Sequence, residues 1–477
     1  MKKFIVVTAF YIIGGISACF AVESSPEAGW QDIFNGKNLD GWHQIGGKAT
    51  FQVEDGVIVG TSVLTPKNSF LATHINYGDF ILEFEAKVDN TLNSGVQFRS
   101  LSNQTYMNGR VHGYQMEMDT SARAWTGGIY DEARRKWLYT LGSNEQGRQA
   151  YLPEQWNKFR IEAVGTRLRT YVNGIATANL VDDETAKGFI ALQVHSIGRN
   201  QSKVGKQVRW RNLRVKTDDL ANELWSMSNR IAEINYIPNQ LSPSQKAEGW
   251  KLLWDGKTTK GWRGAKLNDF PDKGWQIKDG VFSVLPSGGA GAGKYGGDIV
   301  TLEEFSDFEL EIDFNITKGA NSGIKYFVDP SSLKGKGSAV GLEFQILDDK
   351  NHKDAKRGTA GNRTLGSLYD LITAANLTEG NGATKRFNGI GKWNRARIVV
   401  RKGKVQHWLN GLQTLEFDRH SQKFRELVAK SKYAKKPNFG EWEKGPILLQ
   451  DHGDLVHFRT IKIRRLAQVE PSEMSAK

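Results

Sequence analysis

"DFELEIDFNI", residues 307–316, decides the fold, because apolar and polar side chains alternate along it. Residues two apart share one face of a β-strand, so the pattern predicts a strand with one buried face. The run "GDFILEFEAKV", residues 78–88, repeats the pattern. The apolar positions of the two runs are Phe308, Leu310, Ile312, Phe314 and Ile316, and Phe80, Leu82, Phe84, Ala86 and Val88.

These two runs belong to a tandem repeat, because other pairs of similar stretches follow in the same order. The pairs include "GWQDIFNGKNLDGW" (29–42) with "GWKLLWDGKTTKGW" (249–262), "NSGVQFRS" (93–100) with "NSGIKYFVD" (321–329), "GYQMEMD" (113–119) with "GLEFQILDD" (341–349), and "GFIALQVHS" (188–196) with "GPILLQDHG" (445–453). Similarity that recurs in one order indicates a duplicated domain.

Both copies place Asn-Gly between strand-like runs, at residues 173–174 and 410–411, which predicts type I′ hairpin turns. We therefore expect an all-β fold of two antiparallel sandwiches with concave faces, at residues 28–217 and 245–467. Residues 218–244 are expected to form a linker helix and a tether, since Leu220, Leu224, Met227 and Ile231 have helical spacing before Pro238. The second copy also has an insert, 422–440, that predicts a short helix and a flap beside the site.

The N-terminus, "MKKFIVVTAFYIIGGISAC", combines two lysines with a short apolar stretch, as an export signal over residues 1–21 does. Residues 16–19 resemble a bacterial lipobox, which would attach a lipid to Cys19 and tether the chain to a membrane. Cleavage after Ala21 is the alternative. In either case the protein is expected in the periplasm or at the outer membrane. Because Cys19 is the single cysteine, no disulfide can form within the chain.

The chain of 477 residues has a net charge of +13, and its basic surface would attract anionic lipids or acidic glycans. No nucleic-acid-binding motif accompanies the charge, so we expect a solvated exterior and no nucleic-acid partner.

Polar side chains recur on one face of the repeated strands and predict a lined groove in each copy. The pairs are Gln450 with His452, Gln193 with His195, Glu343 with Gln345, and Gln115 with Glu117. Lys325, His407, Tyr369 and Tyr130, each in a repeated motif, complete the expected substrate-binding set. A solvent-facing strand surface is the alternative interpretation.

The loop "DDKNHKDA" of the second copy holds Asp348, Asp349, His352 and Asp354. Such a cluster can bind a metal ion or supply a proton, although Asp and Asn are also common in turns. The first copy keeps Asp119 but has no histidine in this loop. The sequence thus fixes no cofactor, with a divalent metal ion as one hypothesis.

Taken together, "NGKNLDGW", "NSGI", "GLEFQILDD", "TLGSLYDLI", "HWLNG" and "LQDHGDLVHFRTIKIR" resemble the 3-keto-disaccharide hydrolase domain over nearly all of both copies. The resemblance implies a concanavalin A-like jelly roll that acts on sugars oxidised at carbon 3. The first copy departs at "LQVHS", where Val194 stands in place of Asp451, and in its missing histidine.

This activity implies a base near C2, a donor to the enolate oxygen and an acid near the leaving oxygen. We expect Glu343 or His452 to be the base and His352 or Asp348 to be the acid or a metal ligand. The donors are expected among Gln345, Gln450 and Tyr369.

Two other functions stay open at this point. A conventional glycosidase needs two carboxylates flanking the bond, whereas the second copy has Glu343-Phe-Gln345, and the first copy has Glu117-Met-Asp119 with no glutamate following. A pair of carbohydrate-binding modules would use some of the 14 tryptophans for stacking, although repeated ones such as Trp42 and Trp262 suit the core better.

Overall fold

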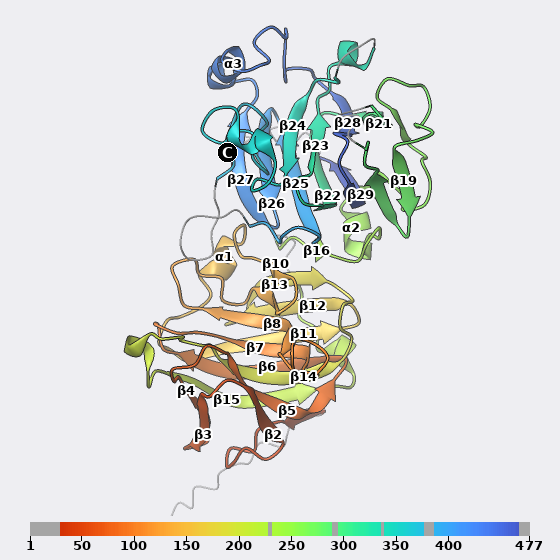
Figure 1. Ribbon diagram of the computed structural model, residues 1–477. Coiled ribbons are helices and arrows are strands. Elements are labelled where there is room, and N and C mark those ends of the chain that lie inside the picture. The colour runs from red at the N-terminus through yellow and green to blue at the C-terminus, as the bar shows by residue number, and fades with distance from the viewer. Residues whose placement is uncertain (1–28, 228–230, 289–293, 335–337, 376–385, 467–477) are drawn as a thin grey trace, which may run out of the picture.

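The computed structural model describes residues 29–227, 231–288, 294–334, 338–375 and 386–466. It contains two β-sandwiches, and Figure 1 shows them stacked, with the strands of the first running across the view and those of the second running along it. The export signal and Cys19 lie outside the described residues.

The first sandwich consists of two mostly antiparallel sheets. The β6 sheet has the order β16 (Ile234–Asn235), β13 (Ile175–Val181), β12 (Arg167–Val172), β11 (Asn157–Val164), β6 (Phe80–Val88), β15 (Gln207–Lys216), β4 (Val57–Thr61) and β3 (Thr50–Glu54), with β1 (Trp30–Asp32) also on β15. The β7 sheet has the order β10 (Lys136–Tyr139), β9 (Ile129–Glu132), β8 (His112–Asp119), β7 (Asn93–Leu101), β14 (Gly188–Val194), β5 (Ser69–Tyr77) and β2 (Trp42–Gly46).

The second sandwich repeats this plan. The β22 sheet has the order β19 (Trp275–Lys278), β20 (Val281–Val284), β29 (Val456–Arg465), β22 (Phe308–Ile316), β25 (Asn394–Arg401), β26 (Lys404–Leu409) and β27 (Leu412–Asp418), with β17 (Lys251–Leu252) on β29. The β23 sheet has the order β18 (Trp262–Gly264), β21 (Ile299–Phe305), β28 (Gly445–Leu449), β23 (Asn321–Tyr326) and β24 (Leu342–Leu347). Each sandwich has its own apolar core.

The expected strands and turns are confirmed. β6 and β22 form where the alternation predicts them, and their apolar side chains are buried. Asn173 and Gly174, like Asn410 and Gly411, have positive φ angles, as a type I′ turn requires. Trp42 and Trp262 are also buried, in the two cores.

The polar face of β22 is less exposed than the alternation predicts. Glu309 and Asp313 are buried, because arginines of the neighbouring strands pair with both carboxylates. Arg395 binds Asp313 at 2.7 Å and also donates to the carbonyl of Asn235, so the segment joining the sandwiches covers part of this face.

The linker helix expected between the copies is wrong for the described residues. In its place the chain has the 3₁₀ turn η2 (Leu220–Asn222), residues 224–227 without regular secondary structure and the short strand β16, before α2 (Pro243–Ala247). The physical reason lies in the first sandwich: Arg160 donates to the carbonyl of Glu223, and the N–H of Trp225 donates to Glu162. These backbone groups bond to side chains of β11 instead of to an intrahelical ladder.

The remaining helices are α1 (Glu145–Arg148), α3 (Gln422–Ala429), η1 (Gln201–Lys203), η3 (Pro330–Leu333) and η4 (Lys353–Lys356). Among the described residues, no helix has the length and apolar character that crossing a membrane demands. The helix predicted in the 422–440 insert is confirmed as α3.

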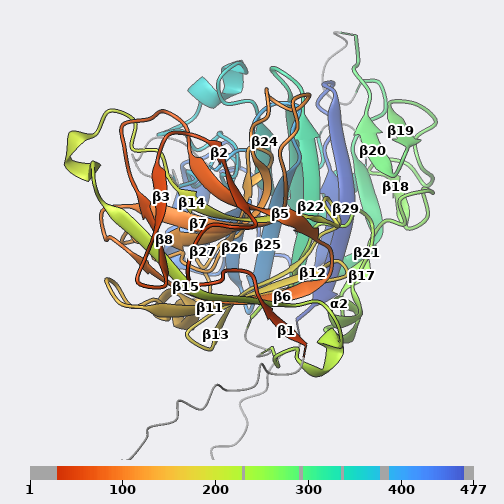
Figure 2. The ribbon, with the colours of Figure 1, turned by 90° about the horizontal axis from the view of Figure 1, so that it is seen from below.

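The two sandwiches touch through the turn that carries Gly411. Its carbonyl accepts a hydrogen bond from Thr140, and Leu412 packs on a small apolar cluster that contains Trp137 and Leu141. Figure 2, the view from below, shows the two sandwiches overlapping along the stacking direction.

Candidate active site

The Asn-Ser-Gly motif shapes the polar face of both the β7 and the β23 sheet. Ser322 donates to the carbonyl of Gln450 at 2.8 Å and so fixes β28 beside β23. Gly323 leaves room for a side chain from the next strand, since a Cβ at this position would lie 2.2 Å from Glu343 Oε1. Gly95 makes the same space for Gln115 in the first sandwich. The motif therefore lets a long polar side chain lie flat across the sheet.

Glu343 and Lys325 face each other across β24 and β23 and form the charged centre of the second sandwich. Lys325 Nζ lies 4.0 Å from Glu343 Oε2 and 3.9 Å from Asp298 Oδ2, and it donates to the carbonyl of Ala339. Burial raises the pKa of Glu343, while Lys325 and Lys432 act in the opposite direction. A buried carboxylate with a raised pKa suits a general base near neutral pH.

Lys432 comes from the insert after α3, which the first copy lacks. Its N–H donates to Asp370 at 2.9 Å, and its Nζ lies 4.1 Å from the ring centroid of Tyr369. The Tyr369 hydroxyl donates to Asp354 at 2.8 Å. The insert thus places an exposed ammonium at the edge of the Glu343 site, as the expected flap would. The sequence signalled the insert but did not single out Lys432.

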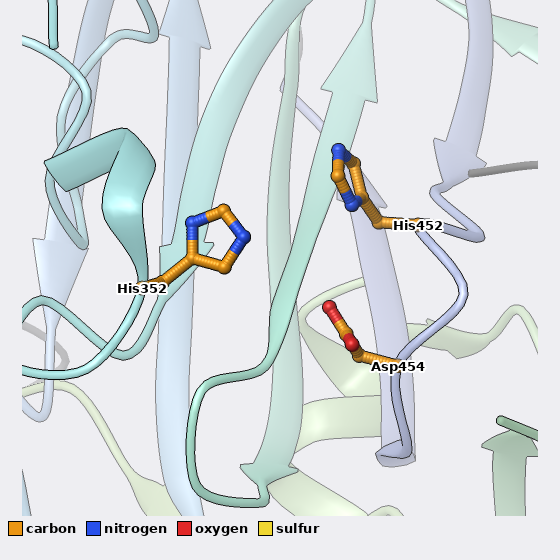
Figure 3. Close-up of side chains that lie close together, drawn as sticks. All are labelled: His352, His452 and Asp454. Atoms are coloured by element: carbon orange, nitrogen blue, oxygen red, sulfur yellow. The ribbon is translucent and has the colours of Figure 1, made fainter. Parts of the chain in front are cut away.

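His352, His452 and Asp454 lie together (Figure 3), and Asp298, which acts on Glu343, also interacts with His452. One ligand atom from each lies within 4.8 Å of the others, and the two imidazole rings are nearly perpendicular, 6.0 Å apart. Two imidazoles and a carboxylate are a donor set for divalent transition metals. His352 Nδ1 accepts from the N–H of Asp354, and Asp454 Oδ2 accepts from the N–H of Asn321, which orients these two side chains.

Asp451 and Asp454 also shape the loop after β28. Asp451 Oδ2 accepts from the N–H of Gly297, and its own N–H donates to Asp298. Sequence reasoning missed the roles of Asp298 and Asp454, although Asp454 follows His452 at a spacing that keeps both side chains near one loop.

Gln345 and Gln450 lie on the same polar face. With its amide oriented to satisfy its neighbours, Gln345 donates to Glu343 Oε1 at 3.3 Å. The buried Oε1 atom of Gln450 has no hydrogen-bond partner among the described residues. It is therefore available to a bound ligand.

Two expected site residues lie elsewhere. His407 is a core residue: its Nε2 is 2.8 Å from the Tyr326 hydroxyl, and burial lowers the pKa of His407 to about 3. It lies on β26 between the sheets, because a side chain of the "HWLNG" motif alternates inward there. Asp348 accepts hydrogen bonds from the backbone of Gly319 and from Asn351, so it stabilises a turn.

The first sandwich places its own expected residues around a cavity of about 1150 Å³. The expected residues that line it are Gln115, Glu117, Tyr130, Gln193 and His195. His195 is exposed, and its Nδ1 lies 2.8 Å from the carbonyl of Ser196.

The strand registers show how the two copies differ. Gly95 faces Glu117 and Gly323 faces Gln345, so Glu117 stands at the position of Gln345, and Gln115 stands at that of Glu343. The carboxylate has thus moved two residues along the strand. Burial raises the pKa of Glu117 to about 7, although Asn93 and Gln115 donate to its oxygens at 2.6 and 2.7 Å.

Comparisons with known proteins agree with the repeat. The model of the 3-keto-alpha-glucoside-1,2-lyase-like domain matches residues 29–216 and again 249–464. A 3-keto-disaccharide hydrolase of Bacteroides thetaiotaomicron is 36% identical over 274 residues, covering 53% of this chain and 90% of the relative. A crystal structure from Parabacteroides distasonis, provisionally assigned as a glycosyl hydrolase, is 30% identical with a TM-score of 0.40, covering 48% of this chain and all of the other. The carbohydrate-binding module CBM66 of Bacillus subtilis is 16% identical with a TM-score of 0.25, covering 37% and 95%.

Proposed function

The chain belongs to the 3-keto-alpha-glucoside-1,2-lyase-like domain family and acts on 3-keto-glycosides, and we propose that its second sandwich carries out the chemistry by elimination followed by hydration. The observation that carries the assignment to the second sandwich is the buried Glu343, held beside Lys325, together with the His352–His452–Asp454 group, since Asp298 interacts with both Glu343 and His452. Among the described residues of the first sandwich, Gln97 and Gln115 stand in place of the lysine–carboxylate pair, and no group of three possible metal ligands is found.

The reaction begins at C2 of the oxidised ring. A ketone at C3 acidifies the proton on C2, and Glu343 removes that proton. The electron pair forms an enolate and then expels the glycosidic oxygen from C1, which leaves as an alcohol after taking up a proton. Water then adds across the resulting C1–C2 double bond, so the sum of the steps is hydrolysis.

Lys432 is the group that we propose to stabilise the enolate, because the Tyr369 hydroxyl, the expected donor, already donates its single proton to Asp354. Lys432 lies at the edge of the site that contains Glu343, over the ring of Tyr369, and an ammonium donor to the C3 oxygen lowers the barrier most when it is fixed in advance. Asp354 and Arg363 hold Tyr369, because Asp354 accepts the Tyr369 hydroxyl and pairs with Arg363 at 3.2 Å.

His352, His452 and Asp454 would hold a divalent metal ion, which when bound supplies a Lewis acid for the C3 oxygen. The donor set fits, since the ligand atoms lie close together and two of the three residues are oriented by backbone N–H groups. Without reference to the ion, His452 also offers an imidazole for proton transfer to the leaving oxygen.

A conventional two-carboxylate mechanism is disfavoured by the residue two positions beyond Glu343. That residue, Gln345, bears an amide, which cannot act as nucleophile or general acid.

A substrate deuterated at C2 tests the proposed route. Elimination requires the C2–D bond to break, so the label is lost to water and the rate with the deuterated substrate falls. Full retention of deuterium in the released 3-keto sugar, with no rate difference, would replace the proposal by direct displacement at C1.

We also propose that the chain is exported and tethered through a lipid on Cys19. The proposal rests on the two lysines, the apolar stretch and the lipobox-like residues 16–19. Mass spectrometry of the mature N-terminus tests it: a lipid-modified Cys19 is expected, and an unmodified N-terminus at Val22 would refute the tether.

A further inference from the structure

Two buried amides, Gln115 and Gln193, line the cavity of the first sandwich, and a third, Gln97, bonds to Gln115. Gln97 and Gln193 both donate to Gln115 Oε1, at 2.5 and 2.9 Å, and Gln115 in turn donates to Glu117. Gln193 is fully buried, yet its Oε1 atom has no partner among the described residues. A buried polar atom that lines a cavity without a partner points to a ligand that supplies one.

The positions that form the charged centre of the second sandwich carry uncharged side chains in the first. By strand register, Gln97 stands at the position of Lys325, and Phe70 stands at the position of Asp298. Val194 likewise stands in place of Asp451. This cavity therefore has hydrogen-bonding amides but lacks the lysine and the aspartates of the second site.

The metal-binding group is also missing from the first copy. Ile197 stands where the second copy has Asp454, and the loop after β8 contains no histidine. Four of the charged residues at the rim form pairs, Arg123 with Asp119 at 2.8 Å and Arg110 with Glu132 at 3.1 Å, and Lys67 and Glu117 are the other two charged side chains of the lining. The cavity thus offers little net charge to attract an ion.

We propose that this cavity is a separate, non-catalytic binding site for a neutral, unoxidised disaccharide. Amides and a carboxyl group match the paired donors and acceptors of vicinal sugar hydroxyls. Tyr130 and Phe70 add aromatic surface to the lining. The volume of about 1150 Å³ exceeds the range of about 300–1000 Å³ typical of small-ligand sites, so a disaccharide fits.

The site would hold glycan next to the enzyme before the glycan is oxidised. Both sandwiches belong to one chain and touch at Thr140 and Gly411. Sugar bound by the first sandwich is therefore held near the second site. Binding of this kind raises the local concentration of glycan without any contribution to the chemical step.

Saturation-transfer NMR on the full chain with cellobiose and maltose, both unoxidised, tests the proposal. At least one of the two is expected to bind, and Gln193→Ala is expected to weaken that binding about tenfold, the effect of losing about 1.4 kcal/mol. Lys158→Ala, an exposed position on the β6 sheet, is the control and should leave the affinity unchanged.

A second variant protects the test against misfolding. Tyr130→Ala truncates a half-buried side chain of the lining, and it should also weaken sugar binding while the thermal midpoint stays near that of the unaltered protein. Absence of binding by both sugars would overturn the proposal. So would binding that survives Gln193→Ala and Tyr130→Ala but is lost with Gln450→Ala, because the sugar would then occupy the second sandwich.

Discussion

Glu117→Gln should stabilise the first sandwich at alkaline pH and have no effect at acid pH. The Glu117 side chain is 6% exposed, and burial raises its pKa from 4.5 to about 7. A raised carboxyl pKa means that the folded state holds the proton more tightly than the unfolded state. Stability is therefore full below pH 4.5 and falls as the pH rises toward 7, because the unfolded chain ionises first.

The size of the effect follows from the two pKa values. Each pKa unit corresponds to about 1.4 kcal/mol, so ionised Glu117 costs the folded state about 3 kcal/mol above pH 7. Glutamine at this position reproduces the neutral side chain found at Gln345 and removes that cost. The free energy of unfolding of the variant should exceed that of the unaltered protein by up to about 3 kcal/mol at pH 8 and match it at pH 4.

Guanidinium denaturation followed by tryptophan fluorescence at both pH values measures this difference. The second sandwich is identical in the two proteins, so its contribution cancels. Glu145→Gln, an exposed carboxylate on α1 of the same sandwich, is the control and should show no such dependence. An equal effect of Glu117→Gln at both pH values would refute the reasoning, because a packing change does not depend on the proton.

The remaining predictions concern the second site. His452→Ala should lower turnover of a 3-keto-glycoside about 10²- to 10⁴-fold with little change in thermal midpoint, because the imidazole is only half-buried. His195→Ala should leave turnover intact. The opposite pattern in steady-state assays would move the chemistry to the first sandwich. Lys432→Met should lower kcat about 10²- to 10³-fold, with partial recovery in Lys432→Arg, and an unchanged kcat would remove Lys432 from enolate stabilisation. Dialysis against a chelator should release a divalent metal measurable by mass spectrometry and reduce turnover, and His352→Ala should contain no metal. A chelator-resistant enzyme with no bound metal would leave the His352–His452–Asp454 group as proton-transfer residues.

Much of the fold could be predicted from the sequence because its determinants are local. Period-two alternation places β6 and β22, and the Asn-Gly pairs place two hairpin turns with positive φ. The prediction of a linker helix was wrong because the conformation of this segment depends on tertiary contacts. Arg160 and Glu162, far away in sequence, bond to backbone groups of Glu223 and Trp225 that a helix would use.

The site was predictable only in part, for a related reason. Strand periodicity brings Glu343, Gln345 and Gln450 to one face, and the structure places them there. Periodicity does not show that His407 points into the core. The alternation on β26 tells which residues share a face of the strand, but not whether that face turns toward the core or toward solvent. Lys432 belongs to an irregular insert, whose docking depends on a hydrogen bond to Asp370.

The central claim, that the second sandwich cleaves glycosides only after oxidation at C3, is tested most directly by product analysis of the full chain with a 3-keto disaccharide and with its unoxidised parent. The 3-keto disaccharide should be split into its two sugars, and Glu343→Gln should abolish this cleavage, while the parent stays intact. Cleavage of the parent at a comparable rate, or full activity in Glu343→Gln, would contradict the account, since neither outcome is compatible with proton removal from a carbon made acidic by the neighbouring ketone.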